Sequence, residues 1–112
     1  MKKSPHKDYL FRAILSLRTV DECYDFFEDL TTVKELDEMA KRIRVATLLL
    51  DDRVYSEILG EEGEVTASSA TISRVNRCIK YGNGGYSTVI GRLKENGVAL
   101  PDADRAKGAK KK

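Results

Sequence analysis

Residues 70–80, Ala-Thr-Ile-Ser-Arg-Val-Asn-Arg-Cys-Ile-Lys, have the types and spacing of a helix that binds a polyanion. Ile72, Val75, Cys78 and Ile79 recur at intervals of three and four residues, so they form one apolar stripe. The opposite face carries short side chains near the start of the helix and cations near its end. Short side chains let a helix approach the floor of a DNA groove, and long cations at the rim reach phosphates.

A short helix is also expected just before this stretch, over residues 54–59. Two short helices, of which the second is small and basic on its outer face, are typical of a helix-turn-helix, here residues 54–80. The predicted contacts to base edges in double-stranded DNA are Ser69, Ala70 and Ser73, with Thr71 as a less central neighbour. The predicted contacts to phosphates are Arg77, Lys80 and Ser56.

Charge is distributed unevenly along the chain. The formal net charge is only +2, but residues 21–64 carry fourteen acids and five cations, whereas residues 65–94 carry five cations and no acid. Such an asymmetry would orient the protein toward a polyanion. A solvated basic helix without a partner remains the alternative on charge alone.

The composition indicates one small helical domain. The chain has 112 residues, no Trp and two prolines, and 41% of its residues are hydrophobic. This length suits a single domain, and a small core often gains apolar burial by dimerisation. No stretch approaches the roughly 20 apolar residues of a membrane span, so no membrane association is expected and the expected location is cytoplasmic.

The sequence offers little for catalysis or metal binding. Cys23 and Cys78 are expected to be reduced, mostly buried thiols rather than a disulfide or metal site. His6, the single histidine, falls in the N-terminal segment and is given no role. No carboxylate pair or Cys–His pair stands at a useful spacing, so neither an enzyme nor a cofactor is expected.

Periodicity and capping signals divide the chain into helices. Helices are expected over residues 9–17, 22–30, 32–50, 54–59, 70–80 and 86–96. Thr19 or Asp21, Thr32 with Glu35, and Thr66 or Ser68 supply the expected caps, and a glycine-rich turn follows residue 81. Residues 1–8 and 98–112 are predicted to be disordered basic segments on either side of a helical domain at 9–97.

The run from residue 70 to residue 86, which ends in Ile-Lys-Tyr-Gly-Asn-Gly-Gly-Tyr, resembles the YerC/YecD group of the Trp repressor superfamily. Residues 22–32 and 35–42 are similar as well, so the resemblance spans about residues 9–95. It implies an all-α, multi-helical bundle that forms an intertwined homodimer with two helix-turn-helix units. The role that it implies is DNA-binding regulation of transcription.

The resemblance also implies an effector site, with Thr32, Arg42 and Arg74 at its polar positions. Three other positions depart from the Trp repressor pattern: Val75 replaces a glycine, Asp29 a leucine and Cys78 a serine. The effector that the resemblance implies is tryptophan. A valine in the space that its indole ring would occupy would overpack the site, at a cost of about 1–3 kcal/mol. Tryptophan is therefore not expected to bind, and salt bridges to nearby acids are the alternative role of both arginines.

The turn of the helix-turn-helix is another departure. Residues 60–64, Gly-Glu-Glu-Gly-Glu, make this turn about three residues longer than in the family that the chain resembles, and they add three acids. Acids beside DNA would repel phosphate unless they point away. A longer loop is therefore expected, with the second helix still seated by its apolar stripe.

Together these features predict a sequence-specific DNA-binding transcriptional regulator that does not depend on tryptophan. Two alternatives remain open from the sequence. One is a helical dimeric module that docks on an acidic protein, and the other is a sensor of a small carboxylate held by Arg42 and Arg74.

Overall fold

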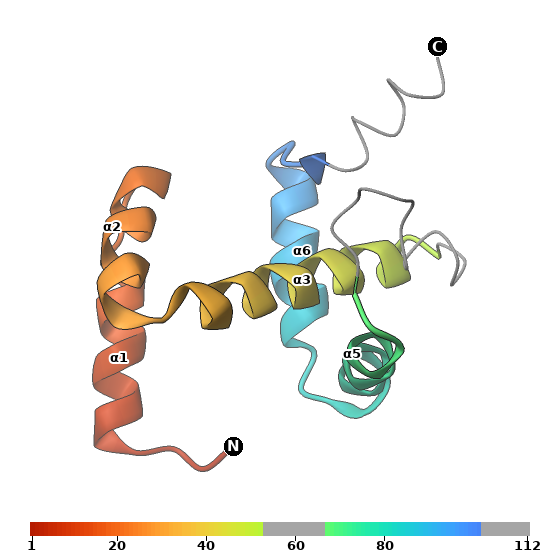
Figure 1. Cartoon of the computed structure of the whole chain (residues 1–112), viewed down its shortest axis with the longest axis horizontal. Helices are drawn as coiled ribbons and strands as arrows, with labels where there is room; N and C mark the ends of the chain where they lie inside the picture. The colour runs from red at the N-terminus through yellow and green to blue at the C-terminus, as the bar shows by residue number, and fades with distance from the viewer. Residues whose placement is uncertain (53–66, 102–112) are drawn as a thin grey trace. The chain divides into compact units, whose positions relative to one another are not determined.

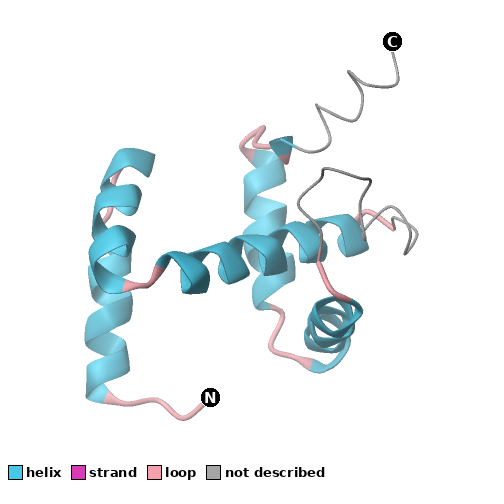
Figure 2. Ribbon diagram, viewed as in Figure 1, coloured by secondary structure: helices cyan, strands magenta, loops and turns pink. Residues whose placement is uncertain are grey.

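The computed structural model describes residues 1–52 and 67–101, and this part of the chain is helical without any strand (Figures 1 and 2). The predicted all-α class is confirmed. The helices are α1 Pro5–Leu15, α2 Val20–Leu30, α3 Val33–Leu50, α5 Ser69–Tyr81 and α6 Gly85–Glu95. The predicted helix at 54–59 and the long turn at 60–64 lie outside the described residues.

Helix α1 begins earlier than its hydrophobic pattern predicts. Ser4 is the N-cap, its side chain accepts a hydrogen bond from the backbone N–H of Lys7, and Pro5 occupies the first turn. A serine cap followed directly by proline is a strong helix start. The helix therefore begins at Pro5 rather than at residue 9, and it ends at Leu15, two residues before the predicted end.

Two threonines begin the next helices. The Thr19 hydroxyl accepts a hydrogen bond from the backbone N–H of Glu22, so α2 starts at Val20. The predicted capping box before α3 is confirmed, because Thr32 N–H donates to the Glu35 carboxylate at 2.8 Å and Glu35 N–H donates to the Thr32 hydroxyl at 3.1 Å. These bonds favour the ionised carboxylate and hold the pKa of Glu35 below its ordinary value, first through the Thr32 backbone and then through its side chain.

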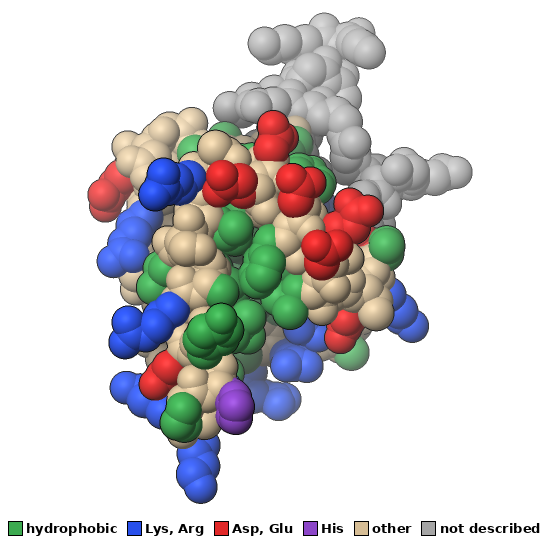
Figure 3. All heavy atoms as spheres, turned by 90° about the vertical axis from the view of Figure 1, so that its left-hand side faces the viewer, with side chains coloured by type: hydrophobic (Ala, Val, Ile, Leu, Met, Phe, Trp, Pro, Cys, Tyr) green, Lys and Arg blue, Asp and Glu red, His purple; other side chains and the backbone are tan. Residues whose placement is uncertain are grey.

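The chain divides into two compact units, residues 1–36 and residues 37–112. In the first unit, neither α1 nor α2 contains a buried residue. In the view of Figure 3, α1 and α2 face the reader, and hydrophobic side chains gather between charged ones of both signs. The exposed large hydrophobic residues of this unit are Met1, Tyr9, Phe11, Leu15, Val20, Tyr24, Leu30 and Val33.

The second unit contains the hydrophobic core. Helices α3, α5 and α6 all contribute to it, and Val45, Ile72 and Val75 are its largest fully buried side chains. Full burial of one such side chain contributes about 1.5–3 kcal/mol to folding. The remaining buried hydrophobic residues are Ala46, Leu48, Ala67 and Ile90. This core orients α5 against α3 and α6.

The acidic end of α3 is stabilised by two local features. Acids at a helix C-terminus oppose the helix dipole, but the Asp51 carboxylate forms an ion pair with the Lys94 ammonium of α6. Asp52 has a φ angle of 58°, in the left-handed region that aspartate tolerates better than most residues. The ion pair thus joins the last turn of α3 to α6.

Two glycines shape the turn between α5 and α6, each for a different reason. Gly84 has a φ angle of 79° and serves as the N-cap of α6, in a conformation that glycine adopts without strain. Gly82 has a negative φ angle, but a Cβ atom there would collide with the carbonyl oxygen of Cys78, which accepts the Gly82 N–H at 2.8 Å. The predicted reversal after α5 is therefore made by one left-handed residue and one close backbone approach.

Alanine substitutions at two glycines should have opposite effects on stability. Gly82→Ala should lower the free energy of unfolding by about 1–3 kcal/mol, because the new methyl group meets backbone. Gly91 lies inside α6, and no atom is near the position of an added Cβ. Gly91→Ala should therefore raise the free energy of unfolding by about 0.5–1 kcal/mol. Urea denaturation measures both, and a stabilised Gly82→Ala variant would contradict the close approach.

Candidate nucleic-acid interface

Helix α5 separates a buried face from an exposed one. Ile72 and Val75 are buried and Ile79 is half-buried, as the predicted stripe requires. The helix starts at the predicted cap Ser68, whose hydroxyl oxygen accepts the backbone N–H of Thr71 at 3.1 Å. The cap and the buried stripe together determine which side chains the helix presents to solvent.

Most of the predicted DNA contacts lie on that exposed face. Ser69, Ala70, Ser73, Arg77 and Lys80 are all exposed, the small ones toward the N-terminal end and the cations toward the C-terminal end. Thr71 differs, because it is half-buried and its hydroxyl lies 3.0 Å from that of Ser68. Ser56 lies outside the described residues, so its contact with a phosphate stays a prediction.

The sequence reasoning missed two exposed residues of this face, Arg74 and Tyr81. They follow Ala70 and Arg77 at a spacing of four residues, so all four side chains lie along one stripe of the helix. Arg74 was assigned to an effector site, and Tyr81 was assigned to the turn, whereas it is the last residue of α5. Extending the i, i+4, i+7, i+11 pattern from Ala70 would have found both residues.

The cations of α5 have no acidic partner in the described part of the chain. Arg74, Arg77 and Lys80 form no ion pair there, and residues 67–94 contain no aspartate or glutamate. The salt bridge predicted as the alternative role of Arg74 is therefore absent among the described residues. These three charges are available to an external anion.

The prediction of two mostly buried thiols is wrong for Cys78. Cys78 is exposed, and Cys23 is half-buried. Cys78 follows Val75 by three residues but lies at the edge of the apolar stripe, so it is exposed while the next residue, Ile79, packs against the core. The i, i+3, i+4 spacing did not ensure that Cys78 is buried, because the core covers only part of the apolar stripe of α5.

The residues of the implied effector site fall in different parts of the fold. Thr32 is exposed in the first unit, where it caps α3, while Arg42 is half-buried and Arg74 exposed in the second. Val75, at the position of the family's glycine, is only 1% exposed and belongs to the core. Its side chain is thus packed in the core, which agrees with the expectation that tryptophan does not bind there.

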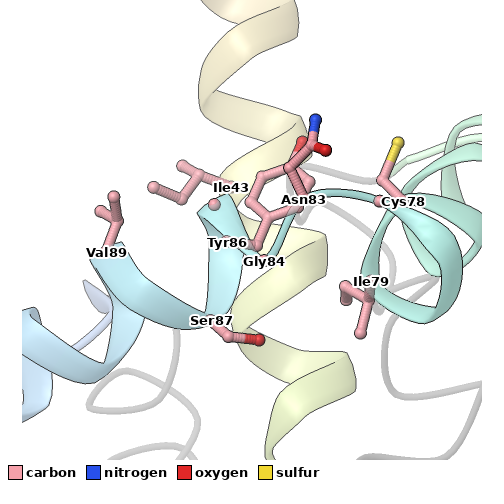
Figure 4. A pocket seen from close by; sticks show the side chains of 10 residues that line it. Ile43, Cys78, Ile79, Asn83, Gly84, Tyr86, Ser87 and Val89 are labelled. Carbon is pink, nitrogen blue, oxygen red and sulfur yellow. The ribbon is translucent and has the colours of Figure 1, made fainter.

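A pocket of about 490 Å³ lies in the second unit beside the C-terminal end of α5 (Figure 4). Ile43 of α3, Ile79 of α5, and Tyr86 and Val89 of α6 supply its hydrophobic wall. Cys78, Asn83, Ser87 and three glycines complete the lining. No charged side chain lines it, and neither effector arginine takes part, so this pocket offers no cation to a carboxylate.

The described residues contain neither a cluster of three or more potential metal ligands nor a helix long and apolar enough to cross a membrane.

Comparisons with known proteins agree with this geometry. Residues 6–94 match the Trp repressor protein family. The chain is 48% identical over 88 residues to the uncharacterised protein YerC of Bacillus subtilis strain 168. These aligned residues are 79% of this chain and 82% of YerC.

Two solved structures are similar as well. A candidate Trp repressor from Staphylococcus aureus matches with a TM-score of 0.76 and 40% identity, over 82% of this chain and 89% of that one. A TrpR-like protein from Eubacterium eligens ATCC 27750 matches with a TM-score of 0.75 and 48% identity, over 82% and 92% of the two chains. The chain belongs to the Trp repressor family, and within that superfamily to the YerC group.

The capping serine offers a test of how α5 is held. Ser68→Ala should lower the free energy of unfolding by about 1 kcal/mol, because the N–H of Thr71 loses its acceptor. Ser69→Ala is the matched control, since that exposed side chain makes no hydrogen bond with a described residue. Urea denaturation of both variants measures the difference, and equal stabilities would contradict the capping role.

Proposed function

We propose that the chain is a DNA-binding transcriptional regulator that places α5 in the major groove of double-stranded DNA. The observation that carries this proposal is the exposed face of α5, small at its N-terminal end and cationic at its C-terminal end. Membership of the Trp repressor family supports a DNA-binding regulator rather than an enzyme. The proposed location is the cytoplasm, where such a regulator meets DNA.

The division of labour along α5 follows from its geometry. Ser69, Ala70 and Ser73 would approach base edges, with Thr71 beside them, because the N-terminal residues of a reading helix reach the groove floor. Arg77 and Lys80 would contact phosphates, and Ser56 is retained as a further proposed phosphate contact. Small polar side chains read bases weakly, so bound water and DNA shape would contribute to sequence preference.

The functional form is proposed to be a homodimer. The first unit exposes several large hydrophobic side chains and buries none of its helical residues, and the second unit has an uncharged, largely hydrophobic pocket. Exposed apolar surface on this scale favours association, because burying it releases about 25 cal/mol per Å². A dimer would also present two copies of α5 to two half-sites.

Tryptophan is not proposed as an effector. Val75 is buried where the family pattern has a glycine, and Asp29 and Cys78 are exposed where it has leucine and serine. Thr32, Arg42 and Arg74 remain candidates for a smaller carboxylate.

Phosphate contacts by Arg77 and Lys80 should appear in the salt dependence of DNA binding. Each lost contact should reduce the slope of log K against log salt by about 0.9, so Arg77→Ala should reduce it by about 1.8 in a dimer. Fluorescence anisotropy with a labelled duplex at several salt concentrations measures this slope, and added tryptophan should leave it unchanged.

Arg92→Ala is the control, because it removes an exposed cation of α6 rather than of α5. The proposal fails if the double variant Arg77→Ala, Lys80→Ala binds duplex DNA as the unmodified protein does. Binding only in the presence of tryptophan would contradict the argument from Val75.

The dimer can be tested through Leu15, which is 82% exposed in the isolated chain. Sedimentation equilibrium should give twice the chain mass of 12.6 kDa, and Leu15→Glu should shift the population toward monomers. His6→Glu, on the opposite side of the same helix, controls for the addition of one negative charge. A dimer unaffected by Leu15→Glu would place the interface elsewhere, and a monomeric protein would contradict the proposal.

A further inference from the structure

Tyr81 is the aromatic residue of the exposed stripe of α5. It is 82% exposed, and its hydroxyl makes no hydrogen bond with any described residue. It follows Arg77 by four residues and Ala70 by eleven, which places it on the same side of the helix as both. An outward tyrosine with an unpaired hydroxyl is therefore continuous with the proposed DNA-binding face.

The length of α5 indicates which part of DNA this residue would meet. A helix rises about 1.5 Å per residue, so Tyr81 lies about 16 Å beyond Ala70 along the axis. The major groove is only about 12 Å wide. If α5 runs across the groove with Ala70 near the base edges, Tyr81 would lie beyond the groove, at the level of the sugar-phosphate backbone.

The chemistry of the side chain suits that position. A phenol hydroxyl is a neutral donor, and tyrosine is among the side chains that contact phosphate oxygens. We infer that Tyr81 is a DNA-contact residue whose hydroxyl donates a hydrogen bond to a backbone phosphate, beside the charges of Arg77 and Lys80. This inference rests on the proposed function and adds a contact that carries no charge.

A neutral contact and a charged contact leave different signatures. Loss of a lysine or arginine contact lowers the salt slope, because fewer counterions are released on binding. Loss of the tyrosine hydroxyl removes a hydrogen bond but no charge, so affinity should fall while the slope stays the same. The loss should also be equal for duplexes of different sequence, because phosphates are common to all of them.

The experiment is an anisotropy titration of the full chain with two labelled duplexes of unrelated sequence at several salt concentrations. Tyr81→Phe should weaken binding about 3- to 10-fold for each lost hydroxyl, and therefore about 10- to 100-fold in a dimer. Thr88→Val is the matched control, because it removes an exposed hydroxyl of α6 rather than of α5. Arg77→Ala serves as the charged comparison, and thermal denaturation checks that each variant is folded.

Weaker binding of Tyr81→Phe to both duplexes, with an unchanged salt slope, supports the inference. Normal binding by Tyr81→Phe together with weakened binding by Arg77→Ala overturns it and leaves the proposed function intact. A loss seen in Tyr81→Ala but not in Tyr81→Phe also overturns it, because the ring rather than the hydroxyl would then make the contact. Absence of any duplex binding by the unmodified protein overturns both proposals.

Discussion

The arrangement of the second unit depends on the burial of the inner face of α5. Ile72 and Val75 are almost completely enclosed in a core that also contains Val45 of α3 and Ile90 of α6. Because a helix is rigid, burying this stripe rotates every outward side chain of α5 into a defined direction. The small residues, the cations and Tyr81 are presented to solvent as a consequence of that packing.

Hydrogen bonds at the helix ends add to this constraint. Ser68 satisfies a free N–H at the start of α5, and Gly82 allows the backbone to return closely against Cys78 at its end. The absence of acids from residues 67–94 then leaves the cations of α5 without partners in the described chain. Core packing sets the direction of these side chains, and local charge composition sets their electrostatic potential.

The first unit poses a different physical problem. Its helices are well capped, yet none of their residues is buried in the single chain. Capping contributes only about 0.5–2 kcal/mol per site, which cannot replace a hydrophobic core. The proposed dimer would resolve this, because a second copy supplies the missing apolar contacts.

The sequence by itself determined the helical class, the capping box of Thr32 and Glu35 and the apolar stripe of α5, because these follow from local spacing and nearest-neighbour hydrogen bonds. It reduced the cap of α5 to Thr66 or Ser68, of which the structure uses Ser68. Local signals also explain why α1 begins earlier than residue 9, because the Ser4 cap and Pro5 start the helix before its apolar pattern begins. Only the tertiary structure decided how much of the apolar stripe of α5 is covered, since Val75 is buried in the core whereas Cys78 is exposed. Burial depends on how much of a helix its neighbours cover, and periodicity along one chain does not contain that information.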